Sequence, residues 1–264
     1  MASRTKRVRR KVRFGHIHAD DVDFDGALAA IAELVANREG GFVVTPNVDH
    51  VCLAEERADL VEAYHKASLS LADGMPLLWL AKAMRTPLPE KISGSDLLVP
   101  LCRQAAQKGH RVYLLGGAPG SGEGAARALE AACPGLLLAG IDAPPMGFER
   151  DAGQNGQVLQ KIRDAKADVV LVALGCPKQE LWMAAHVEAY APAVALGIGA
   201  SLDFLAGKVS RAPQWMSRSG LEWVYRLAQE PGRMAGRYLV RDRAIVRIAW
   251  RMLRMPPARR SFFG

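Results

Sequence analysis

The sequence has little of what marks several common classes of protein. No window of 18 apolar residues occurs in its 264 residues, so no transmembrane helix is predicted. The four cysteines lie apart without a C-x-x-C pair, which argues against a zinc site or a disulfide framework and fits a reducing cytoplasm. Aromatic residues make up only 6% of the chain and no known binding motif occurs, which weakens the case for nucleic-acid binding.

Signatures of catalysis with a nucleophile or a metal are also missing. A G-x-S-x-G motif is absent, and the six histidines form no ligand cluster; His50, near a strand-end turn, is expected on a helix surface. Asp21, Asp23 and Asp25 resemble the start of a calcium loop, but the twelfth position is Ala32 instead of glutamate. We therefore expect Asp25 to cap the first helix, and we predict neither a metal nor a cofactor.

Acidic residues are absent or rare at the two ends of the chain. Residues 1–13 hold seven Lys/Arg and no acid, and residues 207–264 hold thirteen Lys/Arg and three acids. The body between them carries a net charge of about −9, within a chain of net charge +8. We predict a disordered basic arm over 1–13, a catalytic domain over 14–206, and a basic helical appendage over 207–264 that meets an anionic surface or substrate.

Short apolar runs alternate with amphipathic helical segments through the body. Such runs are typical of strands that helices bury on both faces. The sequence therefore predicts an α/β fold with a Rossmann-like parallel sheet flanked by helices. The runs are Gly41–Val44, Leu69–Ala72, Val112–Leu115, Leu136–Ala139, Val169–Leu174 and Val194–Leu196, and two of the helices are expected at Gly122–Ala132 and Gln179–Glu188.

Polar or glycine-rich turns follow most of these strands, and in an open parallel sheet such turns meet in a crevice that binds ligands. Asp73 follows the second run and is the best candidate for a general base, although a carboxylate there could instead cap the next helix. Thr45 and Asn47 could bind a sugar or a phosphate, or could form a turn that opens a helix. The loop Gly116–Gly122 resembles a phosphate cradle, but it lacks the Lys-Ser/Thr of a P-loop and a clean G-x-G-x-x-G.

The segment Arg241–Met255 predicts a basic amphipathic helix. Helices of this kind lie on anionic membranes, where each Lys/Arg contributes about 1 kcal/mol. The alternative is a helix docked on the protein's own core or on a second subunit. We expect membrane contact, and we expect removal of residues 208–264 to leave a folded body. On such a helix one face would hold Arg247, Arg251 and Arg254, and another Ile245, Ile248, Met252 and Met255.

A series of short motifs resembles the WecG/TagA/CpsF glycosyltransferases (glycosyltransferase family 26), in the family's order from about residue 14 to 240. Each motif is weak alone, and together they are highly specific. Two departures stand out: Asp73-Gly74-Met75-Pro76 replaces the family's D-G-x-G, and Lys91 stands where many relatives have arginine. The motifs are Thr45–Asn47, Ala72–Gly74, Gly94–Asp96, Val112–Gly117, Pro144–Glu149, Leu174–Glu180, Gly199–Gly207, Arg211–Pro213, Gly220–Arg226 and Gln229–Pro231.

The resemblance implies an inverting, metal-independent enzyme that moves a sugar from a UDP-sugar to a saccharide on polyprenyl diphosphate. The sugar would be N-acetylmannosamine, its uronic acid or glucose, and Asp73 would be the general base. The setting would be cell-envelope or exopolysaccharide synthesis, with peripheral attachment to the inner face of the plasma membrane, a possible homo-oligomer and no nucleic-acid partner. Substrate-binding residues would be Thr45, Asn47, Lys91, Ser95, Asp96, Gly116, Gly117 and Gln179, with Arg226, Arg233 and Arg237 holding the diphosphate.

Two other classes of function remain open from the residues. A Rossmann-type oxidoreductase would need a dinucleotide fingerprint followed by an acidic residue, which the Gly116 loop does not supply convincingly. A basic-tailed RNA-binding protein would bind RNA with steep salt dependence and would have no affinity for UDP.

Overall fold

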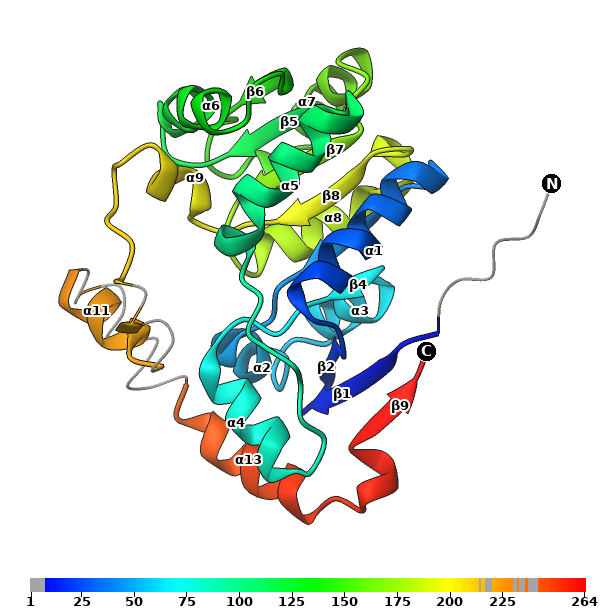
Figure 1. The fold of residues 1–264 in the computed structure, drawn as a ribbon, viewed down its shortest axis with the longest axis vertical. Coiled ribbons are helices and arrows are strands. Elements are labelled where there is room, and N and C mark those ends of the chain that lie inside the picture. Colours follow the sequence, from blue (N-terminus) through cyan, green and yellow to red (C-terminus); the bar gives the residue numbers. More distant parts are fainter. Residues whose placement is uncertain (1–7, 214, 217–219, 230–231, 233–235, 237–241) are drawn as a thin grey trace.

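A computed structural model of the chain describes residues 8–213, 215–216, 220–229, 232, 236 and 242–264 (Figure 1). Its centre is a six-stranded parallel sheet in the order β4-β3-β8-β7-β5-β6. Each predicted apolar run contributes a strand, which confirms the α/β fold. The strands are β3 (Gly41–Val44), β4 (Leu69–Ser70), β5 (Arg111–Gly116), β6 (Leu137–Asp142), β7 (Val169–Ala173) and β8 (Val194–Gly197).

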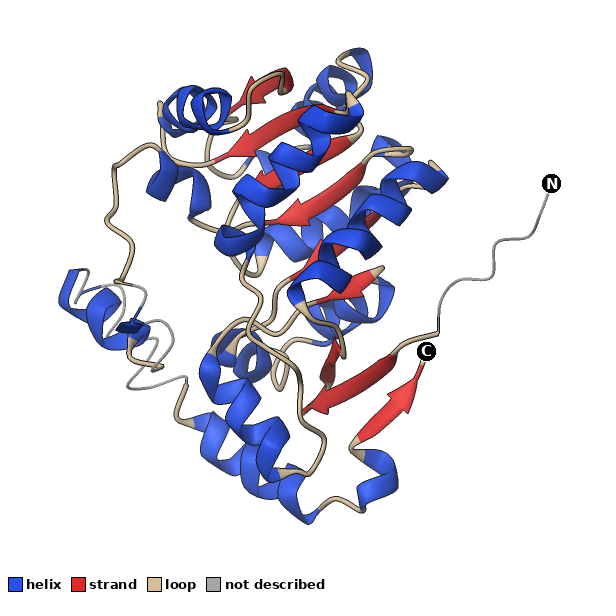
Figure 2. Ribbon diagram, viewed as in Figure 1, coloured by secondary structure: helices blue, strands red, loops and turns tan. Residues whose placement is uncertain are grey.

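Helices cover both faces of this sheet (Figure 2). Along β5, Val112 and Leu114 belong to one buried cluster, whereas Tyr113 and Leu115 belong to the other, as the two-residue period of a strand requires. The first cluster includes α1 (Phe24–Asn37), α5 (Gly94–Lys108), α6 (Ser121–Ala132) and α9 (Ser201–Leu205). The second includes α2 (Val48–Leu53), α3 (Ala58–Lys66), α4 (Met75–Ala83), α7 (Ala152–Asp164) and α8 (Lys178–Tyr190), together with the short helix η1 (Phe148–Arg150).

Two details of the sheet and its helices differ from the sequence expectations. Strand β6 is not buried on both faces, because it is the last strand of the sheet and leaves Leu137 49% exposed. Helix α1 is capped by Asp23, whose side chain accepts a hydrogen bond from the Gly26 amide at 2.8 Å. The predicted cap, Asp25, lies instead in the first turn of α1.

A second, three-stranded sheet joins the two ends of the chain. It consists of β1 (Arg10–Phe14), β2 (Ile17–Asp20) and β9 (Ser261–Phe263), in the antiparallel order β2-β1-β9. Strand β1 therefore takes residues 10–13 out of the predicted disordered arm, because Val12 and Phe14 bury their side chains completely in the core. Residues 1–7 of that arm lie outside the described residues.

The basic C-terminal segment returns to the body of the protein. After α11 (Glu222–Gln229), helix α13 (Ala244–Arg254) packs against α2, and η3 (Pro257–Arg259) leads into β9. Ile248 and Met252 are fully buried in the cluster that includes Phe42 of β3. The apolar face of α13 that was expected to contact a membrane thus packs on the protein's own core. For that face the alternative prediction, a helix docked on the core, is correct.

The docking of α13 and β9 also bears on the expected truncation. Removal of residues 208–264 would expose the core beneath α13 and leave β1 without its β9 neighbour, so the expectation of an intact body does not fit the structure. Within the described residues, no helix has both the length and the apolar character needed to cross a membrane.

Candidate active site

The turns at the carboxyl ends of β3, β7 and β8 meet at one edge of the large sheet. Thr45, which follows β3 and is buried, donates its hydroxyl to the Gly197 carbonyl at the end of β8, at 3.5 Å. Gly94, at the start of α5, lies so close to Gly197 and Ile198 that an added Cβ would come within 3.0 Å of their backbone. These contacts bring two of the predicted motifs, Thr45–Asn47 and Gly94–Asp96, to the end of β8, at the edge where open parallel sheets bind ligands.

Asp73 lies at this edge, three residues after β4. Its backbone amide donates to the Pro46 carbonyl at 2.8 Å, which fixes it beside the turn after β3. The residue at the N-cap of α4 is Gly74, and α4 has no side-chain cap, so Asp73 does not have the capping role that was its alternative. Its side chain is half-buried, and Pro76 in the first turn of α4 stiffens the segment that follows.

Asn47 opens α2 beside Asp73. Its side-chain oxygen accepts hydrogen bonds from the amides of Asp49 at 3.0 Å and His50 at 3.4 Å. The helix-opening turn expected as one alternative for Thr45–Asn47 is therefore present. The same cap fixes the Asn47 side chain at the strand edge, next to buried Thr45.

Gln179, at the start of α8, connects that helix to the turn after β8. It is 2% exposed, accepts the Gly199 amide at 3.1 Å and donates its side-chain nitrogen to Oε1 of Glu180 at 2.8 Å. The side chain also packs closely on Gly197, where an added Cβ would lie 2.9 Å from the Gln179 side-chain nitrogen. The glutamine thus holds the turn after β8 in place.

Behind Asp73 lies a buried polar group that the sequence analysis missed. The Nδ1 atom of His50 lies 2.7 Å from the Tyr64 hydroxyl. Burial, then the charges of Glu180, Cys176 and Asp73, raise the pKa of Tyr64 well above its usual value. The expected surface position for His50 is wrong, because α2 turns this side chain into the core, where it is 5% exposed.

Glu180 is the most strongly perturbed carboxyl of this group. It is completely buried, and burial raises its pKa to about 7, with hydrogen bonds from Gln179 and Cys176 only partly offsetting that rise. Its Oε2 atom has no hydrogen-bond partner within the described part of the chain. A buried carboxyl whose pKa is shifted toward neutrality is common at functional sites.

His50, Cys176 and Glu180 form the one candidate metal-ligand set among the described residues. Their ligand atoms all lie within 4.8 Å of one another. Three protein ligands with an open position would suit a zinc ion. The sequence gives no sign of such a set, because the three residues do not lie at the spacing of a known metal-binding motif.

Lys91, Ser95 and Asp96 lie together at the start of α5. Lys91 Nζ donates to Asp96 at 2.8 Å, and the cap residue Ser93 donates to the same carboxylate at 2.6 Å. Burial would raise the pKa of Asp96, but these bonds and the contact with Arg211 lower it to about 2. The Arg211–Asp96 ion pair ties the C-terminal segment to α5, and Ser95 lies beside Ser93, with 3.3 Å between their hydroxyls.

The glycine loop after β5 is partly occupied by the protein itself. The Gly117 amide donates to Ala173 at 2.9 Å, and the Ala118 amide donates to the Asp203 carboxylate at 3.0 Å. Gly116 has φ of 93°, and a Cβ there would come within 2.7 Å of the Ala173 carbonyl. The loop is therefore a tight strand–helix turn, and any phosphate would meet the amides nearer the start of α6.

The predicted diphosphate arginines belong to the appendage. Arg226 lies in α11, and its side chain is outside the described residues, as are Arg233 and Arg237. Gly220, two residues before α11, packs so closely on α4 that an added Cβ would lie 3.0 Å from Cζ2 of Trp79 and 3.3 Å from Met75. Helix α4 begins two residues after Asp73, so the start of α11 is anchored beside the candidate base.

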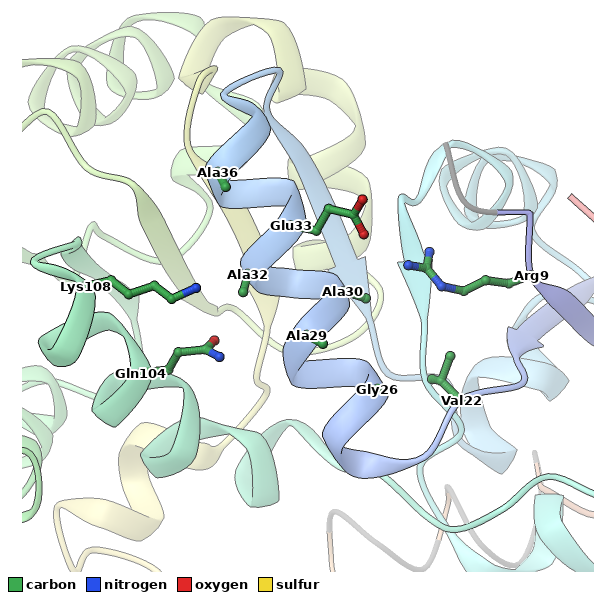
Figure 3. Close-up of a pocket in the computed structure, with 10 residues that line it drawn as sticks. All are labelled: Arg9, Val22, Gly26, Ala29, Ala30, Ala32, Glu33, Ala36, Gln104 and Lys108. Atoms are coloured by element: carbon green, nitrogen blue, oxygen red, sulfur yellow. The ribbon is translucent and has the colours of Figure 1, made fainter. Parts of the chain in front are cut away.

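A separate groove runs along α1, between α5 and the start of β1 (Figure 3). Its cavity volume is about 570 Å³. Its floor consists of small side chains such as Ala29 and Ala32, and Arg9 and Lys108 lie at its two sides. Its one carboxylate, Glu33, lies on α1, away from the carboxyl edge of the sheet where Asp73 lies.

Comparison with known proteins agrees with the motif series. The family model described as "Glycosyl transferase WecG/TagA/CpsF family" matches residues 12–259. An N-acetylglucosaminyldiphosphoundecaprenol N-acetyl-beta-D-mannosaminyltransferase of Bacillus spizizenii is 33% identical over 195 residues, which cover 74% of this chain and 74% of that protein. The protein of the same name in Bacillus subtilis is 30% identical over 74% of this chain and 73% of that protein. The one in Staphylococcus aureus is 30% identical over 78% of this chain and 81% of that protein.

Proposed function

This chain belongs to the WecG/TagA/CpsF family of glycosyltransferases, and we propose that it moves a sugar from a UDP-sugar to a saccharide carried on polyprenyl diphosphate. N-acetylmannosamine is the first candidate for the sugar, because the relatives are named for its transfer to N-acetylglucosaminyldiphosphoundecaprenol. Its uronic acid and glucose are the alternatives to test. The product would enter cell-envelope or exopolysaccharide synthesis.

The observation that carries the proposal is the place of Asp73 at the carboxyl edge of the sheet. Its backbone is fixed to the turn after β3, and its side chain is not used as a helix cap. In the reaction, the acceptor hydroxyl oxygen forms a bond to the anomeric carbon while the bond from that carbon to UDP breaks. Asp73 takes the hydroxyl proton, and attack from the side opposite UDP inverts the configuration.

The departing UDP gains negative charge, which the proposed reaction has to stabilise without a metal. Arginine suits this task because its guanidinium donates paired hydrogen bonds to phosphate oxygens. Arg226, Arg233 and Arg237 are the proposed donors, and the contact of Gly220 with Met75 and Trp79 supports a position of this segment near Asp73. Lys91 and Asp96 act in this scheme by holding Arg211, and with it the start of the appendage.

We also propose peripheral attachment to the inner face of the plasma membrane, where a polyprenyl-linked acceptor resides. The supporting feature is the outward face of α13, where Val246 is 72% exposed and Trp250 is 56% exposed, with Leu253 on the same side. These residues are spaced i, i+4 and i+7, so they form one stripe. An exposed apolar stripe on an arginine-rich helix suits an anionic membrane surface.

The substitution Asp73→Asn tests the catalytic assignment. Loss of a general base should lower kcat by about 10²–10⁴-fold while the substrates still bind. The measurement is turnover of UDP-N-acetylmannosamine with a polyprenyl-diphosphate N-acetylglucosamine acceptor. Asp25→Asn, at an exposed position of α1, is the control for removing a carboxylate. Unchanged turnover in Asp73→Asn would remove Asp73 from this role.

A further inference from the structure

A second pocket lies on the outer face of the three-stranded sheet. Its cavity volume is about 270 Å³, below the range of most sites for drug-sized ligands. Two strands of the sheet, the β1–β2 turn, the last turn of α3 and the C-terminal strand all contribute to its walls. The polar and aromatic side chains that line it are Lys11, Arg13, His16, His18, His65 and Phe262.

The register of the sheet places these side chains together. Val12 and Phe14 point into the core, so Lys11 and Arg13, which alternate with them on β1, point to the opposite face. Lys11 lies directly opposite Phe262 of β9, and Arg13 lies opposite His18 of β2. The histidine of α3, His65, approaches His18 with 6.0 Å between ring centroids.

The lining is rich in positive charge and contains no acid. Two acids lie nearby: Asp20, 3.8 Å from the Lys11 ammonium, and Glu55, which is 3.7 Å from His16 and is paired with Arg251. Burial, then the charges of Lys11, His65 and Arg13, lower the pKa of His18 to about 3. Lys11 donates to the neutral imidazole at 3.3 Å. Asp20 thus partly offsets the charge of Lys11, whereas Arg13 forms no ion pair with either acid in the described part of the chain.

Arg13 has a donor that nothing in the described part of the chain satisfies. Its Nε atom is buried and has no hydrogen-bond partner, and no carboxylate there forms an ion pair with its guanidinium. Instead the guanidinium lies over the Phe262 ring, 5.3 Å from the centroid, which fixes its orientation. A buried, unpaired guanidinium donor costs free energy unless a ligand satisfies it.

We propose that this pocket binds the phosphoryl group of a small molecule or of a lipid headgroup. A phosphoryl group has three or four acceptor oxygens in a tetrahedral arrangement, which suits donors that converge from several elements better than a planar carboxylate does. The guanidinium of Arg13 supplies the paired donors that phosphate prefers, and the Lys11 ammonium adds a point charge. Phe262 offers an aromatic wall to the organic part of the ligand.

The pocket is separate from the candidate active site. His65 lies in the last turn of α3, ahead of β4, whereas Asp73 follows β4 at its other end. The His18 carbonyl accepts the Ser70 hydroxyl at 2.6 Å, so the pocket is attached to the side of the edge strand β4. The phosphoryl-binding proposal therefore does not depend on the proposed glycosyltransferase activity, and that activity does not depend on phosphoryl binding here.

The test is a titration of the full-length protein with inorganic phosphate and with pyrophosphate, followed by calorimetry and by the NMR signals of the histidine rings. The expected result is saturable binding that shifts the His18 and His65 ring signals. Arg13→Gln should weaken binding about tenfold or more, because it removes a charge-assisted hydrogen bond. His65→Gln, at an exposed position that should tolerate it, should weaken binding severalfold even if Arg13→Gln folds poorly.

Lys66→Met is the matched control, because Lys66 follows His65 on α3 and pairs only with Glu62 in the described part of the chain. It removes one positive charge near the pocket without removing a lining group, and binding should stay within about twofold of wild type. Phosphatidylcholine vesicles with and without phosphatidic acid separate a lipid headgroup from a free phosphate compound. The proposal is overturned if neither source shifts the ring signals, or if Arg13→Gln and His65→Gln bind as wild type does.

Discussion

His50 and Tyr64 are joined by a 2.7 Å contact between the imidazole Nδ1 and the phenol hydroxyl, in the core behind Asp73. This contact connects α2, whose first residue follows Asn47, to α3. It lies next to Glu180 and Cys176, so the candidate base is backed by a buried polar group instead of an apolar wall. Buried polar groups of this kind are costly when one member loses its partner.

The first prediction follows from that contact. Tyr64→Phe keeps the buried ring but removes the hydroxyl, which leaves the His50 nitrogen without its partner. We expect the free energy of unfolding to fall by about 1–3 kcal/mol. Urea denaturation followed by circular dichroism would measure it. Tyr113→Phe is the control, because the Tyr113 hydroxyl has no hydrogen bond to the described part of the chain, and equal losses in the two variants would argue against the His50 contact.

The second prediction concerns Glu180 and pH. The carboxyl binds its proton more tightly in the folded protein, where its pKa is about 7, than in the unfolded chain, where it is about 4.5. Its contribution to stability is therefore complete below about pH 4.5 and is lost as pH rises through about 7. Glu180→Gln should remove this loss, which is on the order of 3 kcal/mol.

Thermal melts of wild type and Glu180→Gln across pH 4–8 would test the second prediction. The difference between the two proteins should change steadily between about pH 4.5 and 7 and level off outside that window. Glu188→Gln, on the exposed side of the same helix, should run parallel to wild type. A constant difference between wild type and Glu180→Gln would show that Glu180 does not titrate in this range.

The sheet was predictable from the sequence, and the buried polar group was not. Runs such as Val169–Leu174 are apolar at every position, and only a parallel sheet between two helical layers buries both of their faces. His50, Cys176 and Glu180 meet only after the sheet brings α2 beside the turn that follows β7. No local spacing marks such a set, so a sequence pattern could not reveal it.

The C-terminal helix shows a second limit of sequence patterns. The periodicity correctly gave α13 an apolar face with Ile248 and Met252, but it could not say whether core or membrane covers that face. The answer depends on contacts between distant parts of the chain, such as the packing of α13 on α2 and the pairing of β9 with β1. The basic charge of residues 10–13 was likewise misleading, because it suggested a disordered arm. The alternating side chains of Val12 and Phe14 are buried in the core, and this burial stabilises a strand there.

The third prediction tests whether α13 belongs to the core. Met252→Ala removes a fully buried side chain and should lower the free energy of unfolding by about 2–5 kcal/mol. Leu253→Ala, the neighbouring residue on the exposed side, should cost less than 1 kcal/mol. Urea denaturation would compare the two, and similar small losses would mean that the helix does not pack on the body in solution.

The fourth prediction concerns the ion pair that ties the appendage to α5. Asp96→Asn keeps the size of the side chain but weakens its bonds to Lys91 and Arg211. A partly exposed ion pair contributes little to global stability, about 1 kcal/mol or less. We expect amide exchange of residues 208–212 to accelerate while the melting temperature changes little. Because the carboxyl has a pKa of about 2, wild type should retain this contact at pH 4. Equal exchange in both proteins would mean that Asp96 does not hold the segment.

The last prediction separates the two faces of α13 with respect to membranes. The inward face is covered by the core, so any membrane contact has to use the stripe of Val246, Trp250 and Leu253. The Arg254 guanidinium already lies over the Trp250 ring at 3.6 Å, which places positive charge beside the apolar stripe. Val246→Ser combined with Trp250→Ser should weaken binding to vesicles containing anionic phosphatidylglycerol at least tenfold, because each apolar side chain loses about 1.5–3 kcal/mol of burial. Phe263→Ser, which removes an exposed aromatic ring of β9, is the control and should bind as wild type does. Cosedimentation is the measurement, and full binding of the double variant would exclude this face of α13 as the membrane contact.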